Sequence, residues 1–443
     1  MVFSILGILI ILYAFIDYRK SFLFFLIFRM FLTGNIIFLS VPGIPALTME
    51  LFMIIFFLLM YPFLGRKNEI STQKFPLKLP FYLVLISMCI SAYFSLAGLD
   101  IVFTRTISEY ITQYVFIVMI WKLIDKDEDY GFLIKGITVV VLFSSIYGMF
   151  EYVIQSNPLM EYEMSLVNDP EAVRDMSYVT DKIRGYRVQS IFESAIGAGI
   201  NWGLYATWML TLVFKYRYKL PLKKIVYMAV ILALITIFLV KSRSPIIFVV
   251  LASFSFISFK SKRFIKFFVP VFLAFLCLLP FVTQDVSNVV MSIFDSSYQR
   301  QVSGSSWELR LRTLEACWEV AKQSVFFGVG LKFMSLLTDK TLLFELHGLE
   351  SVWFVTVVYY GLFGVLTQII LAYYTIKKIP EKFHSKNARW LAIAYWITYT
   401  ITTLPGMLLY FYYIIYFYYL KKADYNRCHL IRLMTKSDNT MRV

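Results

Sequence analysis

The sequence predicts an all-α membrane protein with about 12 or 13 transmembrane helices and a large outer loop that contains an amphipathic helix. Three observations support this fold class: 59% hydrophobic and 19% aromatic residues, only 16% charged residues, and repeated apolar runs. Runs of about 15–25 apolar residues can cross a bilayer as helices, and the alternation typical of strands is absent. The runs lie at about 2–16, 21–40, 45–65, 80–98, 107–124, 132–153, 190–214, 225–240, 245–259, 267–283, 351–376, 390–403 and 406–420.

The basic residues predict the orientation of these runs. The net charge is +15, and it comes from the loops between the runs. Lys and Arg concentrate in the cytoplasmic loops of membrane proteins, so the charge indicates orientation and argues against nucleic acid as a partner. The segments assigned to the cytoplasm in this way are 66–78, 215–224, 260–266, 377–389 and the tail after Leu420. The long segments 154–189 and 284–350 are therefore expected on the outer side.

Runs and loops together divide the chain into six parts. These are an N-terminal transmembrane bundle (1–153), a first long outer loop (154–189), central transmembrane helices (190–283), a large outer catalytic loop (284–350), C-terminal transmembrane helices (351–420) and a basic cytoplasmic tail (421–443). The first run lacks a basic start and a small-residue cleavage site, so we expect a short first span there rather than a signal peptide.

The four cysteines predict neither disulfides nor a metal site. They are far apart in the sequence and form no CxxC pair: Cys89, Cys277, Cys317 and Cys428. We therefore expect no zinc centre and no bound cofactor.

A few residues inside the apolar runs stand out. Arg29 lies in the second run, where an unpaired charge is costly, and Glu50 is its candidate partner in a structural ion pair. The run 194–201 is rich in small residues, which is typical of close helix packing rather than of a ligand site. Gly361 and Gly364 support the same interpretation.

The hydrophilic stretch 284–350 contains the predicted amphipathic helix. Ser305 followed by Glu308 forms a capping-box pattern, which predicts that a helix starts there. An apolar stripe with helical spacing follows: Trp307, Leu311, Leu314, Trp318, Ala321 and Val325. We expect this stripe to lie against the membrane domain, with Arg310 at its edge and Arg312 pointing away. A solvated amphipathic surface helix is the plain alternative.

Arginines from separate loops are predicted to collect at the outer face. Arg184 and Arg187 end the first outer loop, Arg243 lies in a short turn between two spans, and Arg310 comes from the amphipathic helix. A guanidinium group holds phosphate oxygens with two parallel hydrogen bonds and stays charged. Each arginine taken alone suits a lipid-headgroup anchor, whereas three of them together favour a diphosphate site formed by Arg187, Arg243 and Arg310.

The order of these motifs resembles the O-antigen polymerase and ligase superfamily over about residues 180–375. The motifs are the segment 186–192 (YRVQSIF), Ser242-Arg243 after a span, Arg310 eighteen residues before Gly328-Val-Gly330, and His347 with Glu350 ahead of Gly361-Leu-Phe-Gly364. The resemblance implies that outer-face arginines bind the diphosphate of a polyprenyl-linked glycan donor. Ligases of this superfamily have a histidine about eleven residues before the helix glycine. Glu350 occupies that position here and His347 lies one turn earlier, which favours a polymerase.

The resemblance therefore implies a glycosyltransferase that needs no metal. Its expected catalytic residues are His347 and Glu350, which share a face at helical spacing, and Arg310. The implied substrates are undecaprenyl-diphosphate-linked oligosaccharides in the bacterial cytoplasmic membrane, with the active site facing outward. Membrane lipids and a polysaccharide chain-length regulator are the further partners expected. The product could be O-antigen, capsule or exopolysaccharide.

Three other functions remain open from the sequence. They are an O-antigen ligase that moves glycan to the lipid A core, a flippase or transporter of lipid-linked oligosaccharide, and a polyprenyl-phosphate-sugar transferase. Transporters typically show internal repeats and short loops, and this chain shows neither. The polyprenyl-phosphate class has an acidic pair in its first outer loop, whereas residues 40–45 contain no acid.

Overall fold

The computed structural model describes residues 2–32, 37–39, 47–65, 74–96, 98–166, 180–181, 185–216, 220–256, 307–331, 333, 346, 351–402 and 409–440. Helices dominate this part of the chain, which confirms the predicted mostly helical fold. Strands are confined to two short antiparallel pairs.

The elements follow one another in this order: α1 (Val2–Ala14), α2 (Tyr18–Phe28), η1 (Arg29–Phe31), β1 (Ile37–Leu39), β2 (Leu47–Thr48), α3 (Met49–Met60), η2 (Tyr61–Gly65), α4 (Lys78–Tyr93), α5 (Leu99–Tyr110), η4 (Ile111–Val115), α6 (Phe116–Leu123), α7 (Asp127–Ile154), α8 (Pro158–Leu166), β3 (Thr180–Asp181), β4 (Gly185–Tyr186), α10 (Ala195–Phe214), α11 (Lys223–Leu239), α12 (Arg243–Ser253), α16 (Trp307–Ala321), α18 (Val352–Tyr373), η7 (Tyr374–Lys378), α19 (Ile379–Lys382), α20 (Lys386–Ile401) and α21 (Leu409–Thr440).

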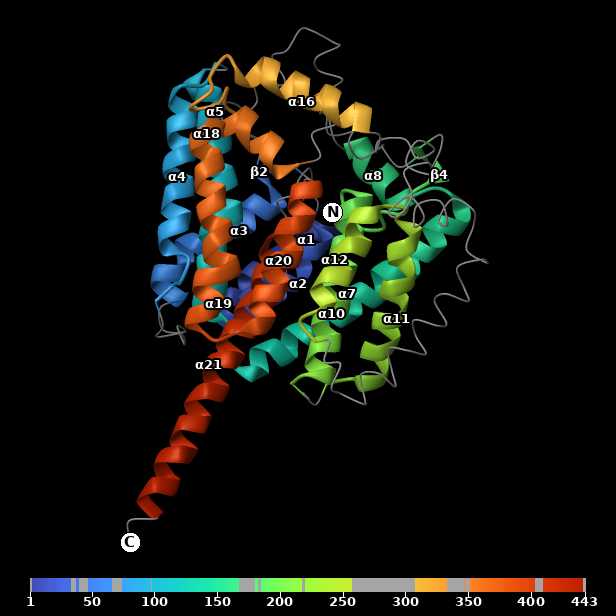
Figure 1. Cartoon of the computed structure of the whole chain (residues 1–443). Helices are drawn as coiled ribbons and strands as arrows, with labels where there is room; N and C mark the ends of the chain where they lie inside the picture. The colour runs from blue at the N-terminus through green and yellow to red at the C-terminus, as the bar shows by residue number, and fades with distance from the viewer. Residues whose placement is uncertain are drawn as a thin grey trace.

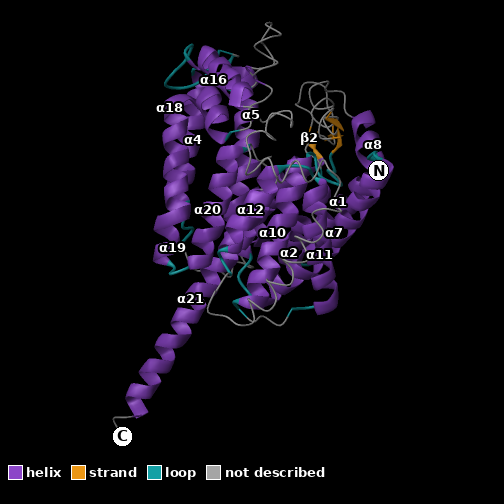
Figure 2. Ribbon diagram, turned by 45° about the vertical axis from the view of Figure 1, so that its right-hand side comes forward, coloured by secondary structure: helices purple, strands orange, loops and turns teal. Residues whose placement is uncertain are grey.

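The helices form two groups that α20 connects. Helices α4, α5 and α18 pack together, and so do α7, α10, α11 and α12, while α20 contacts both α12 and α18 (Figure 1). Helix α16, α8 and β4 lie at one end of the molecule, opposite α19 and the projecting end of α21 (Figures 1 and 2). The two segments predicted to face outward therefore have described parts at the same end.

Among the described residues, two helical stretches are long and apolar enough to cross a membrane by themselves. They are Asp127–Ile154 and Val352–Lys382, which runs through α18, η7 and α19. Shorter apolar helices among the described residues include 3–14, 49–65, 78–93 and 243–253. The total of 12 or 13 spans stays a prediction, and the run 267–283 lies outside the described residues.

One predicted helical run ends earlier than expected. The run 21–40 was expected to be apolar helix throughout, but β1 occupies its end and pairs with β2. Pro42, Gly43 and Pro45 lie between these strands, and such residues do not continue a helix. The predicted helix over 21–40 was therefore wrong at its end, where this short strand pair forms.

The buried charge in the second run has the predicted partner. Arg29 is 2% exposed, and its Nε donates to Glu50 Oε1 over 2.7 Å. Its guanidinium also lies over the rings of Phe116 (4.7 Å) and Tyr410 (4.5 Å). The structural ion pair is confirmed.

Helix α18 is interrupted at Gly361, which has φ +63° and ψ −165°. The segment 325–330 fits against this interruption through backbone hydrogen bonds. Val329 N donates to Val358 O, and Leu362 N donates to Val325 O, each over 2.9 Å. We call these two bonded segments, 325–330 and 358–363, the glycine junction. Gly361 was expected to serve close helix packing, and this interpretation missed the helix break.

Helix α16 begins at Trp307, close to the predicted start, but a different face packs on the body. Leu311, Leu314 and Trp318 are exposed, and the exposed fraction of Trp318 is 59%. The face against α18 carries smaller side chains, Ala316, Cys317 and Val320, which form a buried cluster with Val358. Small residues allow closer approach of two helices. Because the face with these small residues packs on α18, the predicted contact through Leu311, Leu314 and Trp318 was wrong.

Candidate functional site

The structure brings the segments of Arg187 and Arg243 together. Val188 N donates to Leu239 O over 3.2 Å, and Arg187 Nε donates to Val240 O over 3.4 Å. Arg243 follows three residues after Val240, as the first residue of α12. Two loops that are more than fifty residues apart in the sequence therefore share one place in the fold.

The turn before α12 also holds a buried lysine. Lys241 has a φ of +50°, a left-handed conformation that is uncommon outside glycine, and its side chain is buried. Its Nζ lies 5.8 Å from the centre of the Tyr152 ring. With Arg187 only 6% exposed, the region contains two largely buried cations from different loops. Buried cations of this kind favour an anionic ligand or a carboxylate partner.

Small residues place α12 beside α10. A Cβ atom on Gly199 would lie 2.5 Å from Pro245 Cγ, in the first turn of α12. The small-residue run is thus a close packing surface, as predicted, and it fixes the start of the helix that carries Arg243.

Glu151, which the sequence argument did not single out, holds the segment around Arg187. It is fully buried in α7, and its carboxylate accepts three hydrogen bonds. Tyr186 Oη donates over 2.9 Å, Gln189 N over 3.1 Å and Ser190 N over 2.6 Å. Three donors around one carboxylate fix the path of residues 186–190, and with it the position of Arg187. The available signal was a lone acid in the apolar run 132–153.

The same segment is hydrogen-bonded to two further parts of the chain. Asn157 Nδ2 donates to Ser190 O over 2.8 Å, and Ser190 Oγ donates to Ser144 O over 2.7 Å. Burial, with the nearby Glu151 carboxylate, raises the pKa of Tyr186 above its usual value, so the phenol remains a donor at neutral pH. The beginning of α8, the end of α7 and residues 186–190 therefore form one hydrogen-bonded unit.

The other predicted site residues are placed only in part. Arg310 belongs to α16, on the helix face of Cys317, which is buried seven residues later, whereas Arg312 is exposed. Nothing further of the Arg310 side chain is described. Arg184, His347 and Glu350 lie outside the described residues. The roles assigned to these residues stay predictions.

Within the described ranges, no three His, Cys, Asp or Glu side chains come together as metal ligands. The charged side chains that the two paired loops contribute are cations. Arg187, Lys241 and Arg243 can stabilise negative charge on an oxyanion held between the two loops.

Comparison with known proteins finds a family match for the part of the chain that contains Arg243. A family model described as O-antigen ligase matches residues 228–369, which include Arg243, α16 and the glycine junction. Arg187 and Glu151 precede the match. Among curated proteins, none is significantly similar to the chain. The family and the apolar helices together indicate an integral membrane protein. Residues 228–369 thus match the O-antigen ligase family, which confirms the resemblance to the O-antigen polymerase and ligase superfamily.

Proposed function

We propose that the protein is a polysaccharide polymerase of the bacterial cytoplasmic membrane. It transfers glycan from polyprenyl diphosphate onto a lipid-linked repeat unit at the outer face. The observation that carries this proposal is the backbone pairing of the Arg187 segment with the turn before Arg243. Strand β4, which ends directly before Arg187, lies at the same end of the molecule as α16, the helix that contains Arg310 (Figure 1). The family domain supports glycosyl transfer in glycan assembly.

The proposed reaction assigns a separate task to each set of residues. The bond between the donor sugar's anomeric carbon and the diphosphate oxygen breaks, and the diphosphate leaves with the electron pair. An acceptor hydroxyl oxygen forms the new bond and loses its proton. Arg187, Arg243 and Arg310 stabilise the charge that develops on the diphosphate, which is the role of a metal ion in other transferases. His347 and Glu350 act together in taking the proton.

A ligase of the same superfamily is the alternative, and the description of the family model favours it. Glu350 stands where the resemblance implies a ligase histidine, so we favour the polymerase. The two activities differ in the acceptor. A purified assay with a defined lipid-linked repeat as both donor and acceptor gives a ladder of products with a polymerase. With a ligase the same assay gives no glycan transfer until lipid A core is added.

Replacement of Arg310 by Lys tests the diphosphate site. Lysine keeps the charge but loses the paired hydrogen bonds of the guanidinium, so we expect polymer formation to fall about 100-fold at unchanged protein level. Arg312→Ala is the control, because Arg312 is exposed on the same helix. Equal activity of the two variants would refute the assignment of Arg310.

Replacement of the acceptor-side residues tests the proton transfer. Loss of a general base typically lowers a rate by about 10²–10⁴-fold. We expect His347→Ala and Glu350→Gln each to reduce polymer formation without abolishing donor binding. If both variants polymerise at the parental rate, another group accepts the proton.

The orientation is tested by cysteine labelling from outside the cell. Glu319 in α16 and Lys386 at the start of α20 are both exposed, and they lie at opposite ends of the molecule (Figure 1). In a background without the native cysteines, Glu319→Cys should react with an impermeant maleimide and Lys386→Cys should not. The opposite pattern would invert the topology and remove the basis of the proposal.

A further inference from the structure

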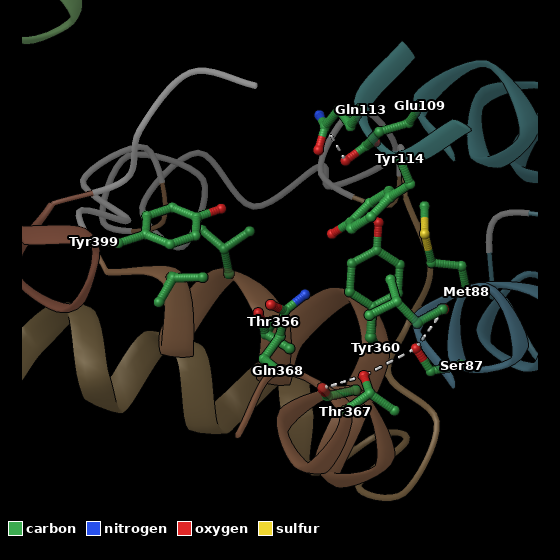
Figure 3. A pocket seen from close by; sticks show the side chains of 14 residues that line it. Ser87, Met88, Glu109, Gln113, Tyr114, Thr356, Tyr360, Thr367, Gln368 and Tyr399 are labelled. Atoms are coloured by element: carbon green, nitrogen blue, oxygen red, sulfur yellow. Dashed lines mark hydrogen bonds between the residues drawn. The ribbon is translucent and has the colours of Figure 1, made fainter. Parts of the chain in front are cut away.

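A cavity of about 60 Å³ lies beside α18, whose residues from Val352 to Gln368 contribute to its lining. Residues from four parts of the chain line it: α4, the α5–η4 stretch, α18 and α20. Figure 3 shows Glu109 and Gln113 above the rings of Tyr114 and Tyr360, with Tyr399 across the cavity. Two of the lining residues, Val352 and Val355, lie at the start of α18. They follow shortly after His347 and Glu350 in the sequence.

Glu109 is the charged group of this cavity. It lies within the apolar run 107–124, where acidic residues are rare and usually functional. The side-chain amide of Gln113 donates to Glu109 Oε1 over 3.5 Å, which is at the long limit for a hydrogen bond. A carboxylate accepts several hydrogen bonds when it is fully satisfied, so the oxygens of Glu109 retain capacity for a donor from a ligand.

Tyr360 provides a second group with unused capacity. Its hydroxyl is buried and has no hydrogen-bond partner among the described residues. A buried hydroxyl without a partner destabilises the folded protein, so a native protein that keeps one calls for an explanation. Tyr114, on the same cavity, is already hydrogen-bonded to the side chain of Gln368. The phenol of Tyr360 therefore differs from its neighbour in remaining available.

We propose that this cavity binds a hydroxyl-bearing group of the acceptor glycan. Glu109 accepts a hydrogen bond from the hydroxyl and Tyr360 donates one to it. A space of this size holds a few water molecules or one small substituent of a sugar, but not a whole sugar ring. The aromatic side chains around it supply the apolar walls that are common in ligand pockets with a few polar groups. This proposal rests on the proposed function, because it assigns the acceptor side of the same reaction.

Bound water is the other source of the same chemistry, and a conservative substitution separates the two. Tyr360→Phe removes only the hydroxyl, and since that oxygen lacks a partner, its loss should leave the melting temperature unchanged or raise it. If this hydroxyl binds the acceptor, its loss should nevertheless lower the efficiency with which the enzyme uses the acceptor. Water alone predicts no kinetic effect. Tyr412→Phe is the matched control, because the Tyr412 hydroxyl is also buried without a partner among the described residues and does not line the cavity.

The experiment uses the purified full chain at saturating lipid-linked donor. The varied acceptor is the repeat-unit glycan on a short alkyl chain without diphosphate. Loss of one neutral hydrogen bond to a ligand raises KM about 2- to 10-fold, and loss of one to a carboxylate raises it about 10- to 100-fold. We expect the smaller rise for Tyr360→Phe and the larger for Glu109→Gln, with KM for the donor unchanged and with both melting temperatures at or above the parental value.

The outcomes separate this inference from the function on which it rests. If the parental protein makes no product from lipid-linked repeats, the proposed function fails. If the parent is active and both cavity variants match it and Tyr412→Phe in acceptor KM, the cavity holds water only and the inference is wrong. Reduced activity that is accompanied by a lower melting temperature in both variants also counts against it, because a structural defect then explains the loss.

Discussion

Two regions of the molecule hold their loops in different ways. Residues 186–190 are fixed by a side chain, since the buried Glu151 carboxylate accepts bonds from Tyr186, Gln189 and Ser190. The glycine junction is fixed by main chain against main chain, with glycines where the two strands of backbone meet. A contact made by one side chain can be weakened in steps. A contact that depends on the absence of side chains is lost when any side chain is added.

The glycine junction leaves no room for a Cβ atom. On Gly328 such an atom would lie 2.4 Å from the Tyr359 carbonyl carbon, and on Gly361 it would lie 2.5 Å from that of Phe326. Both glycines also have positive φ, +74° and +63°. The junction also contacts α4, because Ser91 Oγ donates to Tyr359 O over 2.5 Å. Since α16 precedes this junction directly, the junction sets where the helix with Arg310 leaves the body.

The largest effect is therefore expected for Gly328→Ala and Gly361→Ala. The backbone conformation alone costs about 1–3 kcal/mol with a side chain, and the overlap with neighbouring backbone adds to it. We expect a strong loss of folded protein and a lower melting temperature in detergent. Gly136→Ala is the control, because the new Cβ atom would meet side-chain atoms of Ile27 and no backbone, in a regular helix without a positive φ. Equal stability of all three variants would mean that the junction is not formed.

The next largest effect is expected for Glu151→Gln. The amide offers one acceptor oxygen and places an NH₂ group toward backbone donors, so at least one of the three bonds is lost, at about 1–3 kcal/mol. Displacement of a catalytic group by about 1 Å can lower a rate about 100-fold, so we expect polymer formation to fall between 10- and 100-fold.

The direct measurement of the Glu151 contact is hydrogen–deuterium exchange. The amides of Gln189 and Ser190 should exchange faster in Glu151→Gln and as in the parent in Glu161→Gln. Glu161 lies nearby in α8 but is exposed, with Ser156 Oγ as its donor. Unchanged protection in Glu151→Gln would show that the carboxylate does not hold the segment.

A smaller effect is expected for Tyr186→Phe, which removes one donor and leaves both backbone bonds to Glu151. We expect about a 2- to 10-fold loss of activity. Because burial raises the pKa of Tyr186 in the folded protein, the phenol keeps its proton through the usual tyrosine range. The loss of activity caused by Tyr186→Phe should then persist from about pH 8 to 10. It should shrink only at higher pH, where the phenol loses its proton. A difference that disappears within that range would contradict the assigned bond.

The same two regions show what the sequence alone can predict. Arg187, Arg243 and the Gly328-Val-Gly330 turn were identified because charge and glycine are visible in a single sequence. The residues that contact them could not be predicted in this way. The contacts of Glu151 span thirty-five residues or more, and the bonds of the glycine junction are made by backbone atoms, which carry no residue-specific signal. The wrong prediction of which face of α16 packs on the protein has a related cause. Helical periodicity marks the apolar side of a surface helix but does not distinguish protein from lipid as its neighbour.

The smallest expected effect concerns Cys317, which lies on the face of α16 that packs on α18. It is 1% exposed, and burial raises the pKa of its thiol to about 12. The thiolate is the reactive form, so a membrane-permeant maleimide at neutral pH should label Cys317 only after unfolding in detergent. Cys89 is exposed and serves as the internal control in the same sample, read out by peptide mass spectrometry. Because Cys317→Ser leaves a side chain of similar size, activity should change little. If Cys317 in the folded protein reacts as fast as Cys89, α16 does not rest on α18 through this face. Its large apolar stripe would then be free to make the contact that its periodicity first predicted.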